Sequence, residues 1–259
     1  MSGLVTGLQN RLQRFESASD LREPLYKQLW RGFLFFTPFF TGLLVKIAIF
    51  ANKFFKTTTQ IMKQFLSMSV FAGLLIGIGG LVYLRVGGVA GAVLFAFGLL
   101  SVVMCGAQLY TGKAGFLPYK EFPRLVIMLA GNAVGCALAA LIARYSTSEA
   151  LLANLDVILS ARNSASWYGL ILTSAGTGMI MTLAVYGARR KHYLPLLFGV
   201  PVFILCGLPH CVADAFYYAA AAVYGRFECC LLWAWLWAIV GNYIGCNLPR
   251  WFMQKEFEG

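Results

Sequence analysis

Apolar residues form six long runs along the chain, separated by polar loops that hold most of the charged side chains. A helix needs about 20 consecutive apolar residues to cross the roughly 30 Å hydrocarbon core of a bilayer. Each run is close to that length or longer. The pattern therefore predicts an all-α integral membrane protein with six transmembrane helices, over residues 65–84, 88–112, 125–142, 167–188, 194–224 and 229–248.

Two of the six runs contain residues that interrupt a helix. The second run contains C-G-A-Q-L-Y-T-G at 105–112, and the fifth contains C-G-L-P-H-C-V-A-D at 206–214. A break inside a bilayer is tolerated only where the freed backbone groups are buried in protein or line a cavity. We therefore expect helices 2 and 5 to be broken, with half-helix N-termini that favour an anion.

The two halves of the chain repeat the same motifs in the same order. G-N-A-V-G-C begins at Gly131 in the third run, and G-N-Y-I-G-C begins at Gly241 in the sixth. The Cys-Gly motif likewise occurs in the second run, at Cys105, and in the fifth, at Cys206. Each G-x-x-x-G taken alone is also typical of close helix packing, but packing does not explain why the G-N and the Cys-Gly motifs both recur at matching places. Since each half has three spans, the second half enters the membrane in the opposite sense, which indicates inverted repeats with a site near the midplane.

Charge fixes the expected orientation. Only 12% of the 259 residues are charged and 59% are apolar, which excludes a soluble enzyme and a nucleic-acid binder. The net charge of +11 comes from loops, and seventeen Lys/Arg lie on the side of both termini. The other side has only Arg85, Arg144, Arg162 and Arg226. The positive-inside rule then predicts a multi-pass protein of the cell (inner or plasma) membrane with both termini cytoplasmic.

The segment 30–51 is apolar but contains Pro38 and Lys46. We interpret it as an amphipathic helix that starts near Thr37 and lies at the cytoplasmic interface. The alternative, a seventh span, would place basic residues of the N-terminus outside. The expected organisation is cytoplasmic or interfacial N-terminal helices at 1–60, a six-helix channel domain at 61–252 and a cytoplasmic tail at 253–259.

Within the six runs, His210 and Asp214 are the only side chains that titrate near neutrality or carry a full charge there. Ionisable groups inside a membrane are costly and are functional candidates by default. If the chain after Pro209 is helical, the two lie one turn apart, which predicts a His210–Asp214 pair. The alternatives are a histidine bonded to a backbone carbonyl and an aspartate that caps a helix or pairs elsewhere.

Other polar and aromatic residues of the runs have weaker claims to a role. Thr111 is the polar residue of the first break, where its hydroxyl is placed for His210, an anion or a helix carbonyl. We interpret Asn132 and Asn242 as interhelical hydrogen-bonding residues rather than pore groups. For the aromatic residues there are two interpretations: they gate a narrow pore by dewetting, or they pack as ordinary apolar side chains. These residues are Phe95, Tyr110 and Phe203.

The seven cysteines lie mostly inside the apolar runs, and we interpret them as small apolar packing residues. No metal or other cofactor is expected. An intramembrane metal or redox centre at Cys206, His210 and Cys211 is an alternative, although C-x3-H-C is not a standard ligand spacing.

In combination, these motifs resemble the formate/nitrite transporter family over roughly residues 37–252. The resemblance rests on F-A-G-L-L-I-G-I-G in the first run, C-G-A-Q-L-Y-T-G-K, the two G-N-x-x-G motifs and G-L-P-H-C-V-A-D. It implies a homopentameric anion channel with an aquaporin-like six-helix protomer, a central histidine at His210 and a loop threonine at Thr111. It also implies apolar constrictions at Phe95, Leu99 and Tyr110 on one arm and at Phe203 and Ala213 on the other.

The chain departs from the family pattern at four positions that the resemblance places near the pore. Gln108 and Pro209 stand where acidic residues are usual, while Asp214 and Gly178 stand where asparagines are usual. We therefore expect a divergent member that is not an enzyme and that conducts small monovalent anions or their conjugate weak acids, of the formate, nitrite, hydrosulfide or short monocarboxylate class. The alternative is a pore for a neutral solute such as water or ammonia.

Overall fold

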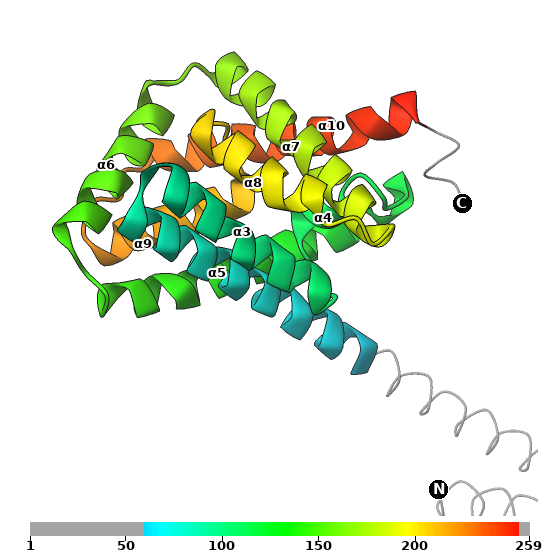
Figure 1. The fold of residues 1–259 in the computed structure, drawn as a ribbon, viewed down its shortest axis with the longest axis horizontal. Helices are drawn as coiled ribbons and strands as arrows, with labels where there is room; N and C mark the ends of the chain where they lie inside the picture. Colours follow the sequence, from blue (N-terminus) through cyan, green and yellow to red (C-terminus); the bar gives the residue numbers. More distant parts are fainter. Residues whose placement is uncertain (1–59, 254–259) are drawn as a thin grey trace, which may run out of the picture. The chain divides into compact units, whose positions relative to one another are not determined.

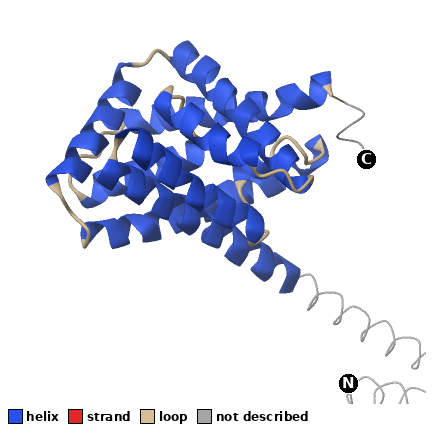
Figure 2. Ribbon diagram, viewed as in Figure 1, coloured by secondary structure: helices blue, strands red, loops and turns tan. Residues whose placement is uncertain are grey.

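The computed structural model describes residues 60–253, and every regular element in that range is a helix (Figures 1 and 2). The expected interfacial helix at 30–51, the remainder of the N-terminal segment and the tail beyond 253 lie outside the described residues. Four described helices are long and apolar enough to cross a membrane: Gln60–Val86, Tyr119–Arg144, Trp167–Arg189 and Cys230–Phe252. They coincide with the first, third, fourth and sixth apolar runs.

The remaining two runs are each split into two shorter helices. The second run forms α3 (Gly88–Met104) and α4 (Tyr110–Lys113), and the fifth forms α8 (Leu194–Leu205) and α9 (Cys211–Val223). The predicted six-span architecture, with helices 2 and 5 broken, is therefore confirmed. The other labelled elements are η1 (Tyr119–Glu121), α5 (Phe122–Arg144), α6 (Glu149–Ser164), α7 (Trp167–Arg189) and α10 (Cys230–Phe252).

The two breaks have the same backbone conformation. Gly106 has φ 65° and Gly207 has φ 67°, in the left-handed region that side chains other than glycine adopt at a cost. Leu109 and His210 then return in extended backbone directly before α4 and α9. A glycine turn followed by an extended stretch thus ends one half-helix and begins the next in both halves of the chain.

In the first half, Asn132 of α5 holds the first break in place. Its Oδ1 accepts a hydrogen bond from the backbone N–H of Tyr110 at 2.9 Å. Its Nδ2 donates to the carbonyl oxygens of Ser69 and Gln108, both at 2.8 Å. One buried amide thereby joins the first helix, the third helix and the loop between α3 and α4.

In the second half, Asn242 of α10 makes the same three kinds of contact. Its Oδ1 accepts from the N–H of Cys211 at 2.8 Å, and its Nδ2 donates to Ser174 O at 2.7 Å and Pro209 O at 3.0 Å. The inverted repeat is therefore present in hydrogen bonding as well as in sequence, and both asparagines bond between helices.

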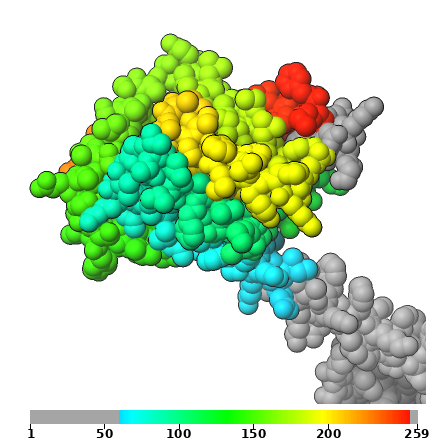
Figure 3. All heavy atoms as spheres, viewed as in Figure 1, coloured from blue at the N-terminus to red at the C-terminus, as the bar shows by residue number. Residues whose placement is uncertain are grey.

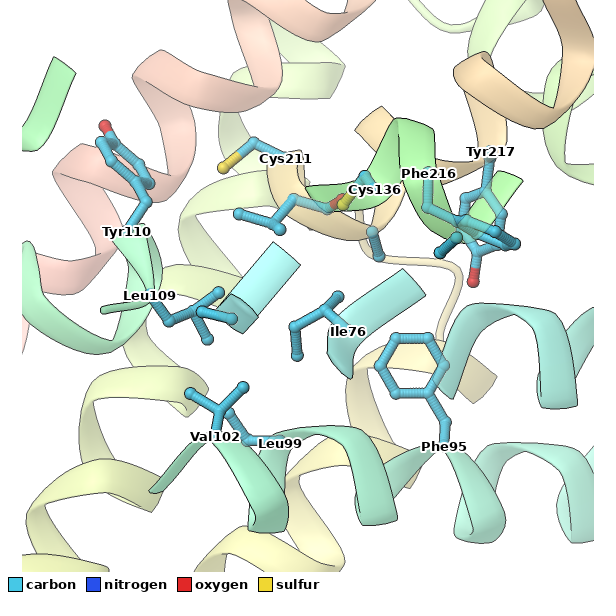
Figure 4. Packing of buried hydrophobic residues seen from close by; sticks show 14 of the residues in the cluster. Ile76, Phe95, Leu99, Val102, Leu109, Tyr110, Cys136, Cys211, Phe216 and Tyr217 are labelled. Carbon is cyan, nitrogen blue, oxygen red and sulfur yellow. The ribbon is translucent and has the colours of Figure 1, made fainter. Parts of the chain in front are cut away.

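The half-helices α3 and α8 pack against each other, and they lie side by side on the visible face in blue-green and yellow (Figure 3). Between the other elements, α5 packs against α9 and α7 against α10. The buried side chains of these contacts form a continuous apolar core, part of which is drawn in Figure 4. The pairing brings the two breaks, about a hundred residues apart in sequence, into the same core.

The helix α6 (Glu149–Ser164) joins the third and fourth long helices, where the apolar pattern indicated only a loop. Ser148 caps its N-terminus by accepting from the N–H of Leu151 at 3.2 Å. Leu151, Leu155 and Leu159 are buried at four-residue spacing, which anchors one face of the helix. It packs against α9 and α10 and lies across the ends of the other helices at the left of Figure 1.

Candidate permeation site

The side chains of Thr111 and His210 meet between the two breaks. Thr111 lies in the short helix α4, and His210 is the N-cap residue of α9. Thr111 Oγ1 and His210 Nε2 are 2.9 Å apart. The Thr111 residue is fully buried and His210 is 2% exposed. Two of the three expected permeation residues are thus in direct contact.

The hydrogen bonds of His210 assign the position of its proton. His210 is the N-cap of α9, and its Nδ1 accepts from the N–H of Ala213 at 3.1 Å. Nδ1 therefore has no proton, and the neutral ring carries its proton on Nε2. Nε2 donates to Thr111 Oγ1, which leaves the Thr111 hydroxyl hydrogen available to an acceptor. Within residues 60–253 no other hydrogen bond of this hydroxyl is found.

Two phenylalanines form an aromatic wall beside the histidine. The ring of Phe203 stacks on His210 with centroids 5.3 Å apart and planes at 19°. The ring of Phe95 meets Phe203 edge-on at 6.2 Å and 85°. Both rings are buried, and they come from α8 and α3, respectively. A tight apolar contact therefore lies next to the polar centre, as a dewetting constriction requires.

Each of the two breaks borders a cavity, and the cavity at the second break is lined by His210 itself. The first, which we call the Lys113 cavity, has a volume of about 130 Å³. The second, the Arg162 cavity, has a volume of about 250 Å³. The Lys113 cavity is lined by Leu99, Leu109, Val185 and Arg189 in addition to Lys113. The Arg162 cavity is lined by Phe203, His210, Ala213, Asp214 and Tyr217 in addition to Arg162.

The expected constriction residues divide between these surroundings. Leu99 lines the Lys113 cavity, and Phe203 and Ala213 line the Arg162 cavity. Leu109, which was not among the expected residues, also lines the Lys113 cavity. Tyr110 lines neither of them: its hydroxyl donates to Ile239 O of α10 at 3.4 Å. In Figure 4 the side chains of Leu109 and Tyr110 point in different directions from the first break. Three of the five expected constriction residues thus line a cavity, whereas Phe95 and Tyr110 line neither.

The structure does not form the pair that we expected between His210 and Asp214. Asp214 Oδ1 instead accepts from Nε and Nη2 of Arg162, each at 3.3 Å. Both nitrogens of His210 are already used by Ala213 and Thr111. The expectation was wrong because the loop that carries Arg162 is a helix, α6, and its last turn reaches the second break.

Arg162 is thus a site residue that the sequence pattern did not reveal. Its Nη1 donates to Gly207 O at 3.0 Å, so the guanidinium also holds the backbone of the break. Burial works against the charge of Arg162, but the neighbouring Asp214 carboxylate prevails and raises the pKa of the guanidinium above its ordinary value. The signals for α6 were the cap at Ser148 and the Leu spacing after it.

Two further expectations are tested by local packing. A Cβ at Gly178 would lie 2.3 Å from the backbone O of Asn242, so this position faces α10 and has no room for the asparagine that the family resemblance suggested. The described part of the chain has no group of three His, Cys, Asp or Glu side chains placed to hold a metal. Cys206, His210 and Cys211 are thus not assembled as a ligand set.

Comparisons with known proteins agree with this geometry. The family model described as formate/nitrite transporter matches residues 44–251. A protein described as a formate-nitrite transporter from Entamoeba histolytica is 28% identical over 241 residues, which cover 76% of this chain and 66%, less than two thirds, of that protein. Among solved structures, a pentameric formate channel with formate bound matches with a TM-score of 0.66 at 17% identity, covering 76% of this chain and 98% of the other.

A second solved structure, an FNT family ion channel, matches with a TM-score of 0.67 at 20% identity, over 76% of this chain and 92% of the other. At these identities the structural matches show a shared fold. The match to the family model extends over most of the chain and includes both breaks. The chain therefore belongs to the formate/nitrite transporter family.

Proposed function

We propose that this protein is a membrane channel or transporter for small monovalent anions or their conjugate weak acids, of the formate, nitrite, hydrosulfide or short monocarboxylate class. The observation that carries the proposal is the Thr111–His210 contact, at 2.9 Å, between two helix breaks that each border a cavity. The family model and the relative described as a formate-nitrite transporter support the same class of substrate.

The path of an anion begins at the Lys113 cavity. Lys113 and Arg189 line it, and none of its described lining residues is a carboxylate, so the local potential concentrates anions. Leu99 and Leu109, both 1% exposed, then remove the hydration shell. Since a bare charge is very costly in an apolar passage, an ion advances only where a new donor replaces water.

Thr111 supplies that donor at the centre. Its hydroxyl receives the Nε2–H of His210 and directs its own hydrogen to the substrate. A substrate that takes up a proton from the aqueous phase, and returns it on the other side, passes Phe203 as the neutral acid, which avoids the desolvation cost of a charge. This favours anions of weak acids over anions of strong acids, and it makes flux dependent on pH.

We further propose a homopentamer in a cell membrane with both termini in the cytoplasm. The pentameric formate channel among the structural matches supports the assembly. Large apolar side chains of α3 that are exposed in the single chain, among them Val93, Leu94 and Phe97, supply surface for lipid or for a neighbouring protomer. The loop charges support the orientation.

The deciding experiment is a flux panel in proteoliposomes with formate, nitrite, hydrosulfide, lactate and ammonia at two pH values. We expect the weak-acid anions to be conducted and Thr111→Val to reduce their flux strongly. Thr182→Val is the matched control, because Thr182 is equally buried but donates to Cys246 O at 3.0 Å instead of contacting His210. Flux of ammonia without flux of the anions would overturn the proposal in favour of a neutral-solute pore.

A further inference from the structure

Arg162 and Asp214 place opposite charges on the wall of one cavity only. The Arg162 side chain is 10% exposed and that of Asp214 is 1% exposed. Both border the Arg162 cavity together with His210. A pair so deeply buried keeps most of its mutual attraction, because little solvent screens it.

The arginine is held rigidly and is not free to follow an anion. Three of its hydrogen bonds are directed to Asp214 Oδ1 and Gly207 O. The leucines on the buried face of α6 fix the helix that carries it. The guanidinium therefore acts as a fixed charge whose counter-charge is equally fixed.

Among the described residues that line the Arg162 cavity, Arg162 and Asp214 are the only lysine, arginine, aspartate or glutamate side chains. The ring of His210 is held as the neutral form by its bonds to Ala213 and Thr111. The remaining groups are phenols and thiols, and they come from the first helix, from α5 and from α9: Tyr83, Cys136, Cys211, Tyr217 and Tyr218. The wall of the Arg162 cavity thus has no net charge.

The negative end of the pair is the less compensated one. Asp214 Oδ2 is buried and has no hydrogen-bond partner among the described residues, whereas each guanidinium nitrogen of Arg162 donates to an acceptor. An anion that enters beside this carboxylate meets an uncompensated negative oxygen. The Lys113 cavity differs, since the charged side chains among its described lining residues are the two cations Lys113 and Arg189.

We propose that the Arg162–Asp214 pair makes the Arg162 cavity admit the neutral conjugate acid rather than the anion. The two ends of the pore then take different protonation forms of one substrate: the anion at the Lys113 end and the neutral acid at the Arg162 end. This inference rests on the proposed function and names the form of the substrate that each entrance accepts. In this inference Asp214 determines specificity, because its carboxylate neutralises the charge of Arg162.

Asp214→Asn tests the inference, because it keeps an oxygen acceptor for Arg162 and removes only the charge. In the original protein, uptake from the Arg162 side follows the neutral acid and rises about tenfold per pH unit of acidification above the pKa of the acid. The variant exposes an uncompensated guanidinium to the cavity. We expect the apparent KM for the anion on that side to fall about tenfold and the pH dependence to flatten, with no change on the Lys113 side.

Asp156→Asn is the matched control. Asp156 lies on α6, the helix that carries Arg162, where it pairs with Arg226 and is exposed. It borders neither of the two pore cavities. It removes the same charge from α6 outside the pore. We expect the KM and the pH profile of this variant to match those of the original protein on both sides.

The double variant Arg162→Gln with Asp214→Asn decides the case even if the single variant fails to fold. It restores a neutral wall, so we expect the steep pH dependence on the Arg162 side to return. A flat profile in the double variant overturns the inference, as does an Asp214→Asn variant whose KM changes equally on both sides. The proposed function fails separately, if the original protein conducts none of the weak-acid anions.

Discussion

Thr111 and His210 share a 2.9 Å hydrogen bond although they belong to opposite halves of an inverted repeat. Since the N–H of Ala213 occupies Nδ1, protonation of the ring must break the N-cap of α9. The hydrogen bond from the Ala213 N–H to Nδ1 therefore couples the protonation state of His210 to the start of the half-helix α9. A pH-sensitive centre and a structural cap are the same side chain here.

This coupling predicts that the His210→Asn variant folds but loses the part of the pH dependence of flux that comes from the histidine. Asparagine is among the preferred N-cap residues and keeps an acceptor for Ala213. We expect the melting temperature to stay within a few degrees and flux to persist. Measured at a constant concentration of the neutral acid, the flux of the original protein should change on acidification, when the ring takes up a second proton and gives up its bond from the Ala213 N–H. If the variant has the same pH profile of flux as the original protein, His210 has only a structural role.

His210→Leu is the contrasting variant. Leucine cannot accept the Ala213 N–H, so the cap is lost at a cost of about 1 kcal/mol. Thermal unfolding in detergent should resolve the two substitutions, with leucine the less stable. Equal stability of both variants would contradict the assigned cap.

The two asparagines predict equal losses of stability in the two halves. Asn132→Ala and Asn242→Ala each remove three hydrogen bonds of a buried amide. We expect each to lower the free energy of unfolding by about 2–4 kcal/mol, because the freed backbone groups stay buried. Asn247→Ala is the control, since Asn247 is also buried in α10 but its side chain makes a single hydrogen bond within residues 60–253, to Tyr243 O. This substitution should lower the free energy of unfolding by less.

How far the sequence predicts this fold depends on how local each signal is. The six spans follow from run length, and the two breaks follow from Gly106, Gly207 and Pro209, because each signal acts within its own helix. Thr111 and His210 were predictable as site residues because polar groups inside apolar runs are conspicuous. Their contact followed from the repeat, which places both breaks at matching depth.

The partner of Asp214 was not predictable in the same way. The pair depends on α6, whose burial comes from packing against α9 and α10 rather than from an apolar run. A charge at i+4 of His210 suggested a local pair, but the cap of α9 already uses Nδ1 and leaves Asp214 to Arg162. Tyr110 is a similar case, since only the direction of the chain at the break decides which neighbour faces the cavity.

Orientation in the membrane gives a further prediction. Ser160 lies on α6 and Arg190 follows α7 at its other end, and both are exposed. In a background without the exposed native cysteines, Ser160→Cys should react with an impermeant thiol reagent only from outside the cell. Arg190→Cys should react only after the membrane is opened. Labelling of both from the same side would refute the six-span arrangement.

The last prediction concerns the backbone of the second break. At Gly207 a Cβ would meet no atom within 4 Å, but φ is 67°, so Gly207→Ala introduces strain without a clash, about 1–2 kcal/mol. Gly88→Ala has the same open space and φ of 54°, and it lies at the start of α3, away from both breaks.

We expect a similar loss of stability in both variants, measured by thermal unfolding. Only Gly207→Ala should also reduce flux, because relief of the strain moves the extended stretch that carries His210. If both variants conduct like the original protein, the break positions the histidine less strictly than its hydrogen bonds indicate.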